Sequence, residues 1–140
     1  MKQVTGEVVK KQRPVNLKLT SIGFPITAIS SVLHRASGVL LFLFIPAVLW
    51  TLWYSLASVS TFTALQHFMQ YFWFRFALWL FLSGLIYHMI AGGRHLLMDM
   101  HFGDSLQGGR FGAIAVLFLS IAIIALFGVY ILISFNHVVW

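Results

Sequence analysis

Long stretches of this chain contain no charged side chain, and this feature restricts its possible folds more than any other. No Asp, Glu, Lys or Arg occurs in residues 36–74, 76–93 or 111–140. About 20 apolar residues in a helix cross a bilayer core, so each stretch is long enough to contain a span. Charged residues make up only 9% of the chain, too few to cover a water-soluble domain. The sequence therefore predicts an all-α integral membrane protein.

Three transmembrane helices are expected within these stretches. We place them at about 36–56, 72–97 and 112–135. Residues 25–140 would then form a single three-helix transmembrane domain, preceded by a basic N-terminal segment at residues 1–24. Because each helix is apolar around much of its circumference, the chain is expected to contact the lipid bilayer and other membrane helices.

The connections between the spans differ in composition. The first linker, residues 57–70, is short and polar, whereas the second, residues 98–110, contains glycines that predict a flexible break. Pro25 suits the first turn of a helix, so the first helix is expected to begin before the bilayer. Pro46 lies in mid-span and should kink this helix, because proline removes one backbone hydrogen bond.

The distribution of basic residues predicts the orientation in the membrane. Six basic residues precede the first span: Lys2, Lys10, Lys11, Arg13, Lys18 and Arg35. The first linker has none, whereas Arg94 and Arg110 flank the second linker. Because cytoplasmic flanks carry an excess of Lys and Arg, the N-terminal segment and the second linker are expected in the cytoplasm. The net charge of +6 is explained by these flanks, so no nucleic-acid partner is expected.

His88 is the ionisable side chain placed deepest in a predicted span. It precedes Arg94 by six residues and therefore lies about 9 Å further into the bilayer, at 1.5 Å of rise per residue. Ionisable groups at this depth are costly and usually functional. His88 is either a ligand of a haem or other metal, or a packing histidine bonded to a neighbouring helix. Gly84, Gly92 and Gly93 flank it and would leave room for a flat macrocycle or for close helix packing.

A second histidine on the same face, His95, cannot share one iron with His88. Two helical turns separate them by about 10.5 Å, whereas two nitrogens across one metal are about 4 Å apart. Neither His34, at the cytoplasmic interface, nor His137, at the outer end, is expected at the depth of His88. A six-coordinate haem would therefore take its other ligand from another chain. Three helices are also few for enclosing a haem, so we expect a heteromeric helix bundle.

Ser31 and Arg35 place a hydroxyl and a permanent cation one helical turn apart at the cytoplasmic end of the first span. Together they are able to hydrogen-bond a quinone carbonyl and to stabilise negative charge on its oxygen. Alternatively, Arg35 or His34 pairs with a haem propionate, or the basic residue only fixes the topology. The chain has no cysteine, so any iron–sulfur cluster must belong to a partner protein.

Two segments resemble a known family, the larger cytochrome b membrane-anchor subunit of bacterial succinate dehydrogenase, respiratory complex II. The first segment consists of RPVNL at residues 13–17, FPIT at 24–27 and SVLHRASG at 31–38. The second is HMIAGGRH at residues 88–95, which continues to Asp99. The three-span layout is similar as well, so the resemblance covers nearly the whole chain.

The resemblance implies a role for each matching residue. His88 falls on the axial ligand of haem b, which is shared with a smaller anchor subunit that supplies the second ligand. Ser31 and Arg35 fall on ubiquinone-binding residues, and His34 with Arg35 lies in the region of the haem propionates. The chain departs from the family at Gly93, where a larger aliphatic residue is usual, and at His101, where a small residue is common.

The function implied by the resemblance is that of a membrane-anchoring cytochrome b subunit of succinate:ubiquinone oxidoreductase. Its expected partners are a flavoprotein, an iron–sulfur protein and the second small anchor subunit, in the bacterial inner membrane. No catalytic residue and no activity are expected in the isolated chain, which lacks succinate-oxidising groups. The alternatives are the anchor of a quinol:fumarate reductase and a structural anchor without cofactor. A small transporter is disfavoured because no acidic residue lies in mid-span.

Overall fold

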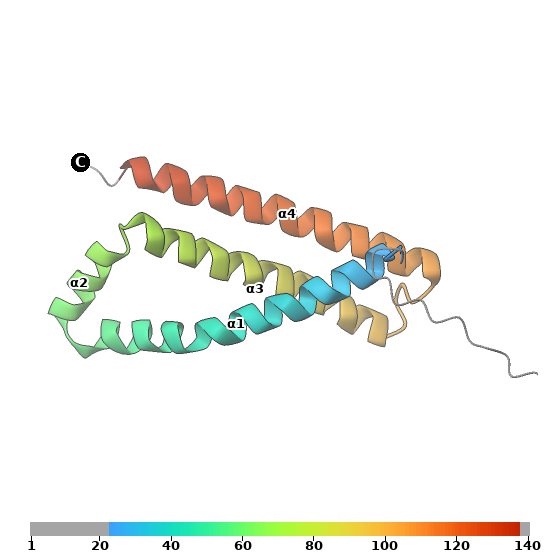
Figure 1. The fold of residues 1–140 in the computed structure, drawn as a ribbon, viewed down its shortest axis with the longest axis horizontal. Coiled ribbons are helices and arrows are strands. Elements are labelled where there is room, and N and C mark those ends of the chain that lie inside the picture. Colours follow the sequence, from blue (N-terminus) through green and yellow to red (C-terminus); the bar gives the residue numbers. More distant parts are fainter. Residues whose placement is uncertain (1–22, 138–140) are drawn as a thin grey trace, which may run out of the picture.

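The computed structural model describes residues 23–137, with the backbone alone at 132 and 134–137, and this part of the chain is all-helical. The helices are α1 (Ile26–Ala57), α2 (Val59–Phe68), α3 (Phe72–Asp99) and α4 (Leu106–His137). Figure 1 shows α1, α3 and α4 as long helices that run antiparallel to their chain neighbours, with the short α2 joining α1 to α3 at one end. The all-α prediction is confirmed.

Three helical segments are long and apolar enough to cross a membrane, as the sequence predicts. They are Ile26–Ala57, Phe72–Asp99 and Leu106–Ile131. Each predicted span overlaps one of them, and each helix extends beyond the span because its polar ends continue outside the apolar stretch. Most of the predicted N-terminal segment, residues 1–22, and the end of the chain, residues 138–140, lie outside the described residues.

The first helix begins where the sequence predicts. Pro25 is its N-cap residue, in an extended conformation with φ −65° and ψ 148°, so α1 starts one residue later than Pro25 itself. Pro46 lies within α1, and Figure 1 shows this helix bending between its two halves. A proline inside a helix lacks one backbone donor and commonly causes such a bend.

Most of the first linker forms helix α2, an element that the sequence analysis does not predict. Ser58 ends α1 in an extended conformation and caps α2: its Oγ accepts from the backbone N–H of Thr61 at 3.1 Å. The Thr61 hydroxyl oxygen in turn accepts from the backbone N–H of Ser58 at 3.0 Å. This reciprocal capping box satisfies helix donors that would otherwise be unpaired. The polar residues Ser58 and Thr61 of this linker therefore cap helix α2.

The second linker is shorter than predicted, spanning only residues 100–105 between α3 and α4. His101 and Gly103 adopt left-handed φ angles of 63° and 73° and reverse the chain. Gly108 and Gly109 instead lie in the first turn of α4. A side chain at Gly108 would meet backbone, because its Cβ would lie 2.9 Å from the carbonyl oxygen of Gly103. These glycines allow tight packing of the turn against α4.

The long helices meet through small residues. Gly84 of α3 faces α1 so closely that a Cβ would lie 2.8 Å from Cδ2 of Leu40. On α4, the buried side chains are Ala113, Val116 and Ser120. Membrane helices approach each other closely through such small residues, because lipid offers little hydrophobic driving force for their association.

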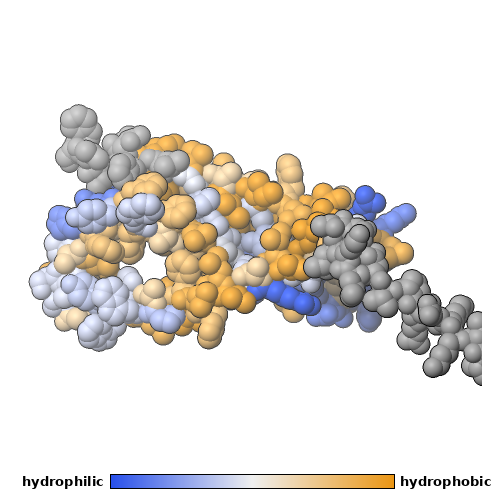
Figure 2. Space-filling view, viewed as in Figure 1, coloured by the Kyte–Doolittle hydropathy of each residue, from blue (hydrophilic) through white to orange (hydrophobic). Residues whose placement is uncertain are grey.

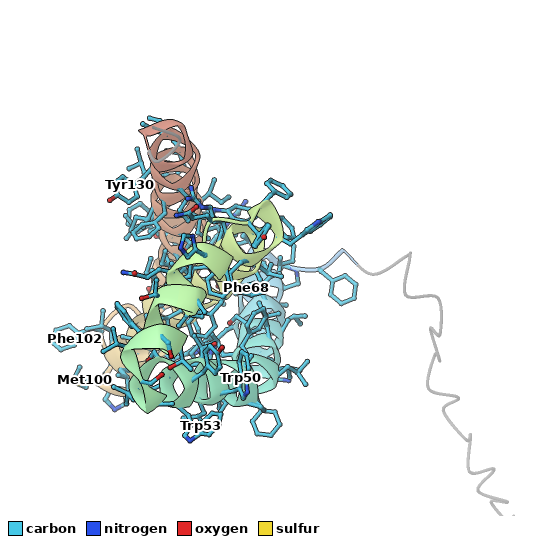
Figure 3. All side chains as sticks on the ribbon, turned by 90° about the vertical axis from the view of Figure 1, so that its left-hand side faces the viewer. Trp50, Trp53, Phe68, Met100, Phe102 and Tyr130 are labelled. Atoms are coloured by element: carbon cyan, nitrogen blue, oxygen red, sulfur yellow. The ribbon has the colours of Figure 1, made fainter. Side chains whose placement is uncertain are left out.

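Most large apolar side chains remain on the outside of this subunit. Figure 2 shows a broad apolar surface over the middle of the molecule, with more polar residues toward both ends. Trp50, Trp53 and Phe68, labelled in Figure 3, are exposed by more than half. Exposed apolar helix faces of this extent are stable only against lipid or another membrane subunit.

Candidate functional site

Three histidine rings lie in a row where the N-terminal half of α1 crosses the C-terminal half of α3. His88 and His95 share one face of α3, as their seven-residue spacing predicts, and His34 of α1 lies between them. The ring centroids of His34 and His88 are 4.3 Å apart, with planes at 25°, and those of His34 and His95 are 5.1 Å apart. This row forms the wall of a pocket between the two helices.

The ring of His34 lies between those of His88 and His95 along α3, so the predicted difference in depth between His34 and His88 stays a prediction, whereas the contact between their rings is unexpected. The two rings are stacked, because Gly38 and Gly92 remove the side chains that would hold α1 and α3 apart here. A Cβ on Gly38 would lie 3.1 Å from Cε1 of His88, and a Cβ on Gly92 would lie 3.5 Å from Nε2 of His34. The register of α1 on α3 cannot be derived from either helix alone, so this contact is not predictable from the sequence. The side chain of His137 lies outside the described residues.

The stacking nevertheless excludes His34 and His88 as opposite ligands of one iron. Two nitrogens on opposite sides of a metal are about 4 Å apart, and the ring centres lie further apart still. Ring faces whose centroids are 4.3 Å apart leave no space for a metal and its macrocycle between them. A second axial ligand for an iron bound by His88 must therefore come from outside this pair.

The hydrogen bonds around His88 define which ring nitrogen is free. Ser37 Oγ lies 2.7 Å from the carbonyl oxygen of His34 and 3.1 Å from Nδ1 of His88. The same carbonyl oxygen lies 3.3 Å from Nδ1. A carbonyl oxygen only accepts, so the hydroxyl proton of Ser37 goes to it, and both oxygens are then able to accept a proton from Nδ1. This arrangement favours the Nδ1–H form of His88, in which Nε2 is the nitrogen available to a ligand.

The residues here fit a haem. A haem-ligating histidine uses one ring nitrogen and usually donates the other N–H to an oxygen of the protein, which is the arrangement at His88. Among the described residues, Nε2 of His34 is buried without a hydrogen-bond partner, so the chain itself leaves this nitrogen unsatisfied. The described part of the chain holds no group of three or more His, Asp or Glu residues able to bind a metal ion alone.

The structure brings the sequence-predicted site residues to one pocket of about 600 Å³. Its lining is formed by Ser31, His34, Arg35, His88, Met89, Gly92, Gly93, His95 and Leu96. Ser31 is half-buried and Arg35 is exposed, one turn apart on α1. The pocket therefore offers a hydroxyl, a permanent cation and imidazole nitrogens around one volume. This combination is suited to a flat ligand that carries carbonyl or carboxylate oxygens.

The glycines that flank His88 were expected either to leave room for a macrocycle or to allow close helix packing, and the structure assigns them differently. Gly84 and Gly92 face Leu40 and His34, so they serve helix packing. Nothing lies within 4 Å of a Cβ built on Gly93, so only this glycine borders open space. A larger side chain would therefore fit at Gly93 in this subunit.

Arg94 has a structural role that the sequence reasoning missed. Its Nη2 donates to the carbonyl oxygen of Gly109 at 2.9 Å, and a Cβ on Gly112 would lie 3.0 Å from its Nε. The guanidinium thus packs onto the first turns of α4. The glycines Gly108, Gly109 and Gly112 are the sequence feature from which a large side chain opposite them could have been predicted.

Within the described residues Asp99 forms no ion pair, and the one ion pair, between His101 and Asp104, is exposed.

Comparisons with known proteins identify the family. The family model described as "Succinate dehydrogenase/Fumarate reductase transmembrane subunit" matches residues 9–127. The chain belongs to this family. It is also 41% identical over 121 residues to the succinate dehydrogenase cytochrome b556 subunit of Coxiella burnetii, a match that covers 86% of this chain and 97% of the relative. The resemblance seen in the sequence is thereby confirmed, and the chain is a membrane subunit of the succinate dehydrogenase/fumarate reductase type.

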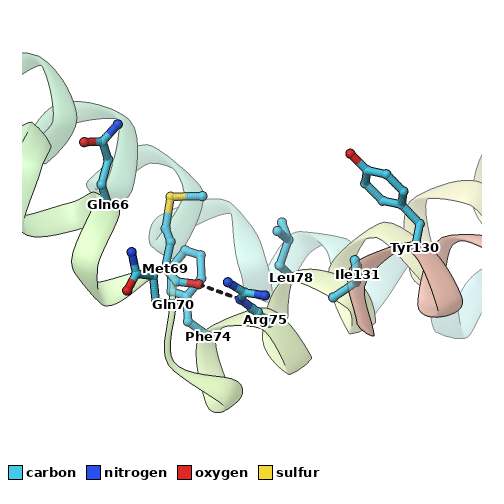
Figure 4. A pocket seen from close by; sticks show the side chains of 8 residues that line it. All are labelled: Gln66, Met69, Gln70, Phe74, Arg75, Leu78, Tyr130 and Ile131. Atoms are coloured by element: carbon cyan, nitrogen blue, oxygen red, sulfur yellow. Dashed lines mark hydrogen bonds between the residues drawn. The ribbon is translucent and has the colours of Figure 1, made fainter. Parts of the chain in front are cut away.

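A second pocket lies at the opposite end of this succinate dehydrogenase/fumarate reductase subunit. It measures about 400 Å³ and is lined by Gln66, Met69, Gln70, Phe74, Arg75, Leu78, Tyr130 and Ile131. Figure 4 shows Arg75 reaching back to the turn before α3, where its Nε donates to the carbonyl oxygen of Met69 at 3.2 Å. This contact keeps the charge of Arg75 near the turn before α3, where a basic side chain at the end of a membrane helix can reach the polar interface. None of the sequence-predicted site residues lines this pocket.

Proposed function

We propose that the chain is the cytochrome b membrane anchor of a succinate:ubiquinone oxidoreductase. In this proposal His88 is an axial ligand of haem b, and Ser31 and Arg35 form part of the ubiquinone-reduction site. The observation that carries it is the position of His88 Nδ1, 3.1 Å from Ser37 Oγ and 3.3 Å from the carbonyl oxygen of His34, which leaves Nε2 for a ligand at the pocket that Ser31 and Arg35 also line. Family membership and the cytochrome b556 name of the relative support it.

Haem b would be held by His88 together with a residue of the second anchor subunit. When bound, haem b would accept and donate single electrons. His88 would bind through Nε2 while its Nδ1–H stays on the oxygens of Ser37 and His34. Nε2 of His34, buried and unpaired among the described residues, and the guanidinium of Arg35 would bind the propionate carboxylates. A charge-assisted bond from Arg35 is the stronger of the two.

Ubiquinone would bind in the same pocket, nearer the N-terminal end of α1. The hydroxyl of Ser31 would hydrogen-bond a quinone carbonyl and orient the ring. The Arg35 guanidinium would stabilise the negative charge that develops on the quinone oxygen during reduction. Electrons would come from an iron–sulfur partner docked at this end, because the chain has no cysteine to hold a cluster. Protons would enter from the same aqueous side.

The rest of the complex supplies what this chain lacks. We propose three partners: a flavoprotein, an iron–sulfur protein and a second small membrane anchor, which would provide the other haem ligand. The complex would lie in a bacterial inner membrane, with the N-terminus of this chain in the cytoplasm. The apolar outer surface of the helices supports contact with both lipid and the second anchor.

A quinol:fumarate reductase anchor is the second candidate, because the description of the matching family names both enzymes. The two differ in the direction of the reaction and not in the residues required here. Reduction of fumarate by a quinol, measured against oxidation of succinate by ubiquinone in the same membranes, would distinguish them.

The reduced-minus-oxidised visible spectrum of membranes that contain the whole complex tests the proposal. We expect a b-type haem signal in the wild type and its loss in His88→Ala, with the subunit still inserted as judged by immunoblot. His67→Ala is the control, because His67 lies on α2, far from the pocket, and its loss should leave the signal unchanged. A full haem signal in His88→Ala would exclude His88 as the ligand. Wild-type membranes without any signal would favour a structural anchor without cofactor.

A further inference from the structure

Ser37 is a buried polar residue to which neither the family resemblance nor the proposed site gives a role. Only 8% of its surface is exposed. Ser37 lies on the side of α1 that faces α3, where its hydroxyl approaches His88. Its hydroxyl lies between two groups: the carbonyl oxygen of His34 at 2.7 Å and Nδ1 of His88 at 3.1 Å. A buried hydroxyl in a membrane helix commonly bonds only to its own helix. Ser37 does this and also reaches the neighbouring helix.

The protons in this small network can be assigned one by one. Ser37 has a single hydroxyl proton, and the short contact to the His34 carbonyl oxygen uses it, since that oxygen cannot donate. The hydroxyl oxygen then has lone pairs facing Nδ1 of His88. If Nδ1 lacked a proton, its lone pair would face two oxygens at 3.1 and 3.3 Å with no proton for either contact. The network is satisfied only with the proton on Nδ1.

Packing contacts also hold the ring of His88 in place, but they do not decide which way round the ring lies. Its Cε1 packs against the backbone of α1 at Gly38, and one face stacks on His34. The hydroxyl of Ser37 supplies the directional contact in this arrangement, because stacking and van der Waals contact permit the ring to turn over by 180°. A turned ring would exchange Nδ1 for a carbon and lose both hydrogen bonds.

We propose that Ser37 is a positioning residue that selects the Nδ1–H tautomer and the ring orientation of His88, and thereby sets the electron density on Nε2. This inference rests on the proposed role of His88 as a haem ligand. A ring N–H that donates to oxygen makes the other nitrogen more basic. A more basic axial nitrogen stabilises the oxidised iron and lowers its reduction potential, one of the ways in which a protein controls a haem.

The test compares three variants in the whole complex by redox titration of the haem and by its low-temperature EPR spectrum. Ser37→Ala removes one acceptor but leaves the His34 carbonyl oxygen, so we expect haem to be retained with a more positive midpoint potential and shifted EPR g-values. Ser37→Thr keeps the hydroxyl and should restore the wild-type potential. Ser120→Ala is the matched control, because this buried hydroxyl donates at 2.6 Å to its own helix at Val116 and, among the described residues, has no hydrogen bond with a histidine. An unchanged potential and spectrum in Ser37→Ala would overturn the proposal.

A second measurement separates this inference from the proposed haem site itself. Nitrogen-15 NMR of the histidine-labelled full chain in lipid bilayers, without haem, reports which nitrogen of His88 carries the proton. We expect the Nδ1–H form in the wild type and in Ser37→Thr, and a mixture with the Nε2–H form in Ser37→Ala. An Nε2–H form in the wild type would overturn the positioning role, whether or not the complex contains haem. A haem-free complex with the expected tautomers would overturn only the function on which the inference rests.

Discussion

The imidazole of His34 is stacked on that of His88, with ring centroids 4.3 Å apart across the contact between α1 and α3. The backbone carbonyl of His34 also lies within hydrogen-bonding reach of Nδ1 of His88. One residue thus holds the proposed haem ligand twice, with its ring against the ring face and with its carbonyl oxygen at the ring edge. A substitution at His34 alters only the ring contact, because the backbone carbonyl is present whichever side chain occupies this position.

The ring of His34 should therefore support His88 by packing. We expect His34→Ala to leave a cavity beside His88 and to reduce the haem content of the purified complex. His34→Phe keeps a flat ring in the same place and should retain more haem than His34→Ala, measured as pyridine haemochrome per complex. Equal loss in the two variants would contradict a packing role. It would point instead to Nε2 of His34, which both variants lack and which is buried without a partner among the described residues.

The sequence predicts those parts of the site that lie on one helix. Ser31 and Arg35 are one turn apart, and His88 and His95 are two turns apart, so helical periodicity alone places each pair on a face. The row His88–His34–His95 depends on the register between α1 and α3, which small residues such as Gly38 determine by allowing close approach. Such a register is a property of two surfaces together, and a single sequence does not contain it in readable form.

Two local features show a similar limit. The capping box of Ser58 and Thr61 was present in the sequence, but the polar composition of residues 57–70 concealed a short helix. The contact of Arg94 with α4 could not be predicted, because its partner there is a backbone carbonyl that leaves no trace in residue identity. Backbone partners of this kind become visible only when the helices are placed.

Ser31 and Arg35 should affect quinone reduction without affecting succinate oxidation. Arg35→Ala removes the cation that would stabilise the reduced oxygen, and we expect ubiquinone reduction to fall by about 10²-fold or more. Ser31→Ala removes one neutral hydrogen bond, about 0.5–1.5 kcal/mol, and should raise the KM for ubiquinone by up to about tenfold. Both rates are measured against succinate oxidation with an artificial dye acceptor, which should stay near that of the wild type.

The dye assay also provides the control for assembly. Loss of both activities in Arg35→Ala would show that the complex fails to assemble, and Arg35→Lys, which retains the charge, would then be the informative variant. Unchanged ubiquinone reduction in an assembled Arg35→Ala complex would contradict the proposed quinone site.

Arg94 should stabilise the contact between α3 and α4. Arg94→Ala removes the hydrogen bond to the carbonyl oxygen of Gly109 and leaves space beside Gly112. A hydrogen bond from a charged group contributes about 1.5–3 kcal/mol, so we expect easier unfolding of the subunit in an SDS titration. Arg110→Ala is the matched control, because it removes the same charge at the same end from an exposed position. Equal effects of the two substitutions would show that charge, and not the contact with α4, is what matters.

The orientation in the membrane can be tested directly, because the chain contains no cysteine. Ser60 on α2 and Asp104 in the turn between α3 and α4 are exposed at opposite ends of the helices. The excess of basic residues at the end that contains Asp104 predicts that this end is cytoplasmic. A membrane-impermeant maleimide added to intact spheroplasts should therefore label Ser60→Cys and leave Asp104→Cys unlabelled until the membrane is opened. The reverse pattern would place Ser31 and Arg35 on the outer side, where no cytoplasmic iron–sulfur partner could deliver electrons, and would contradict the proposed quinone site together with the topology.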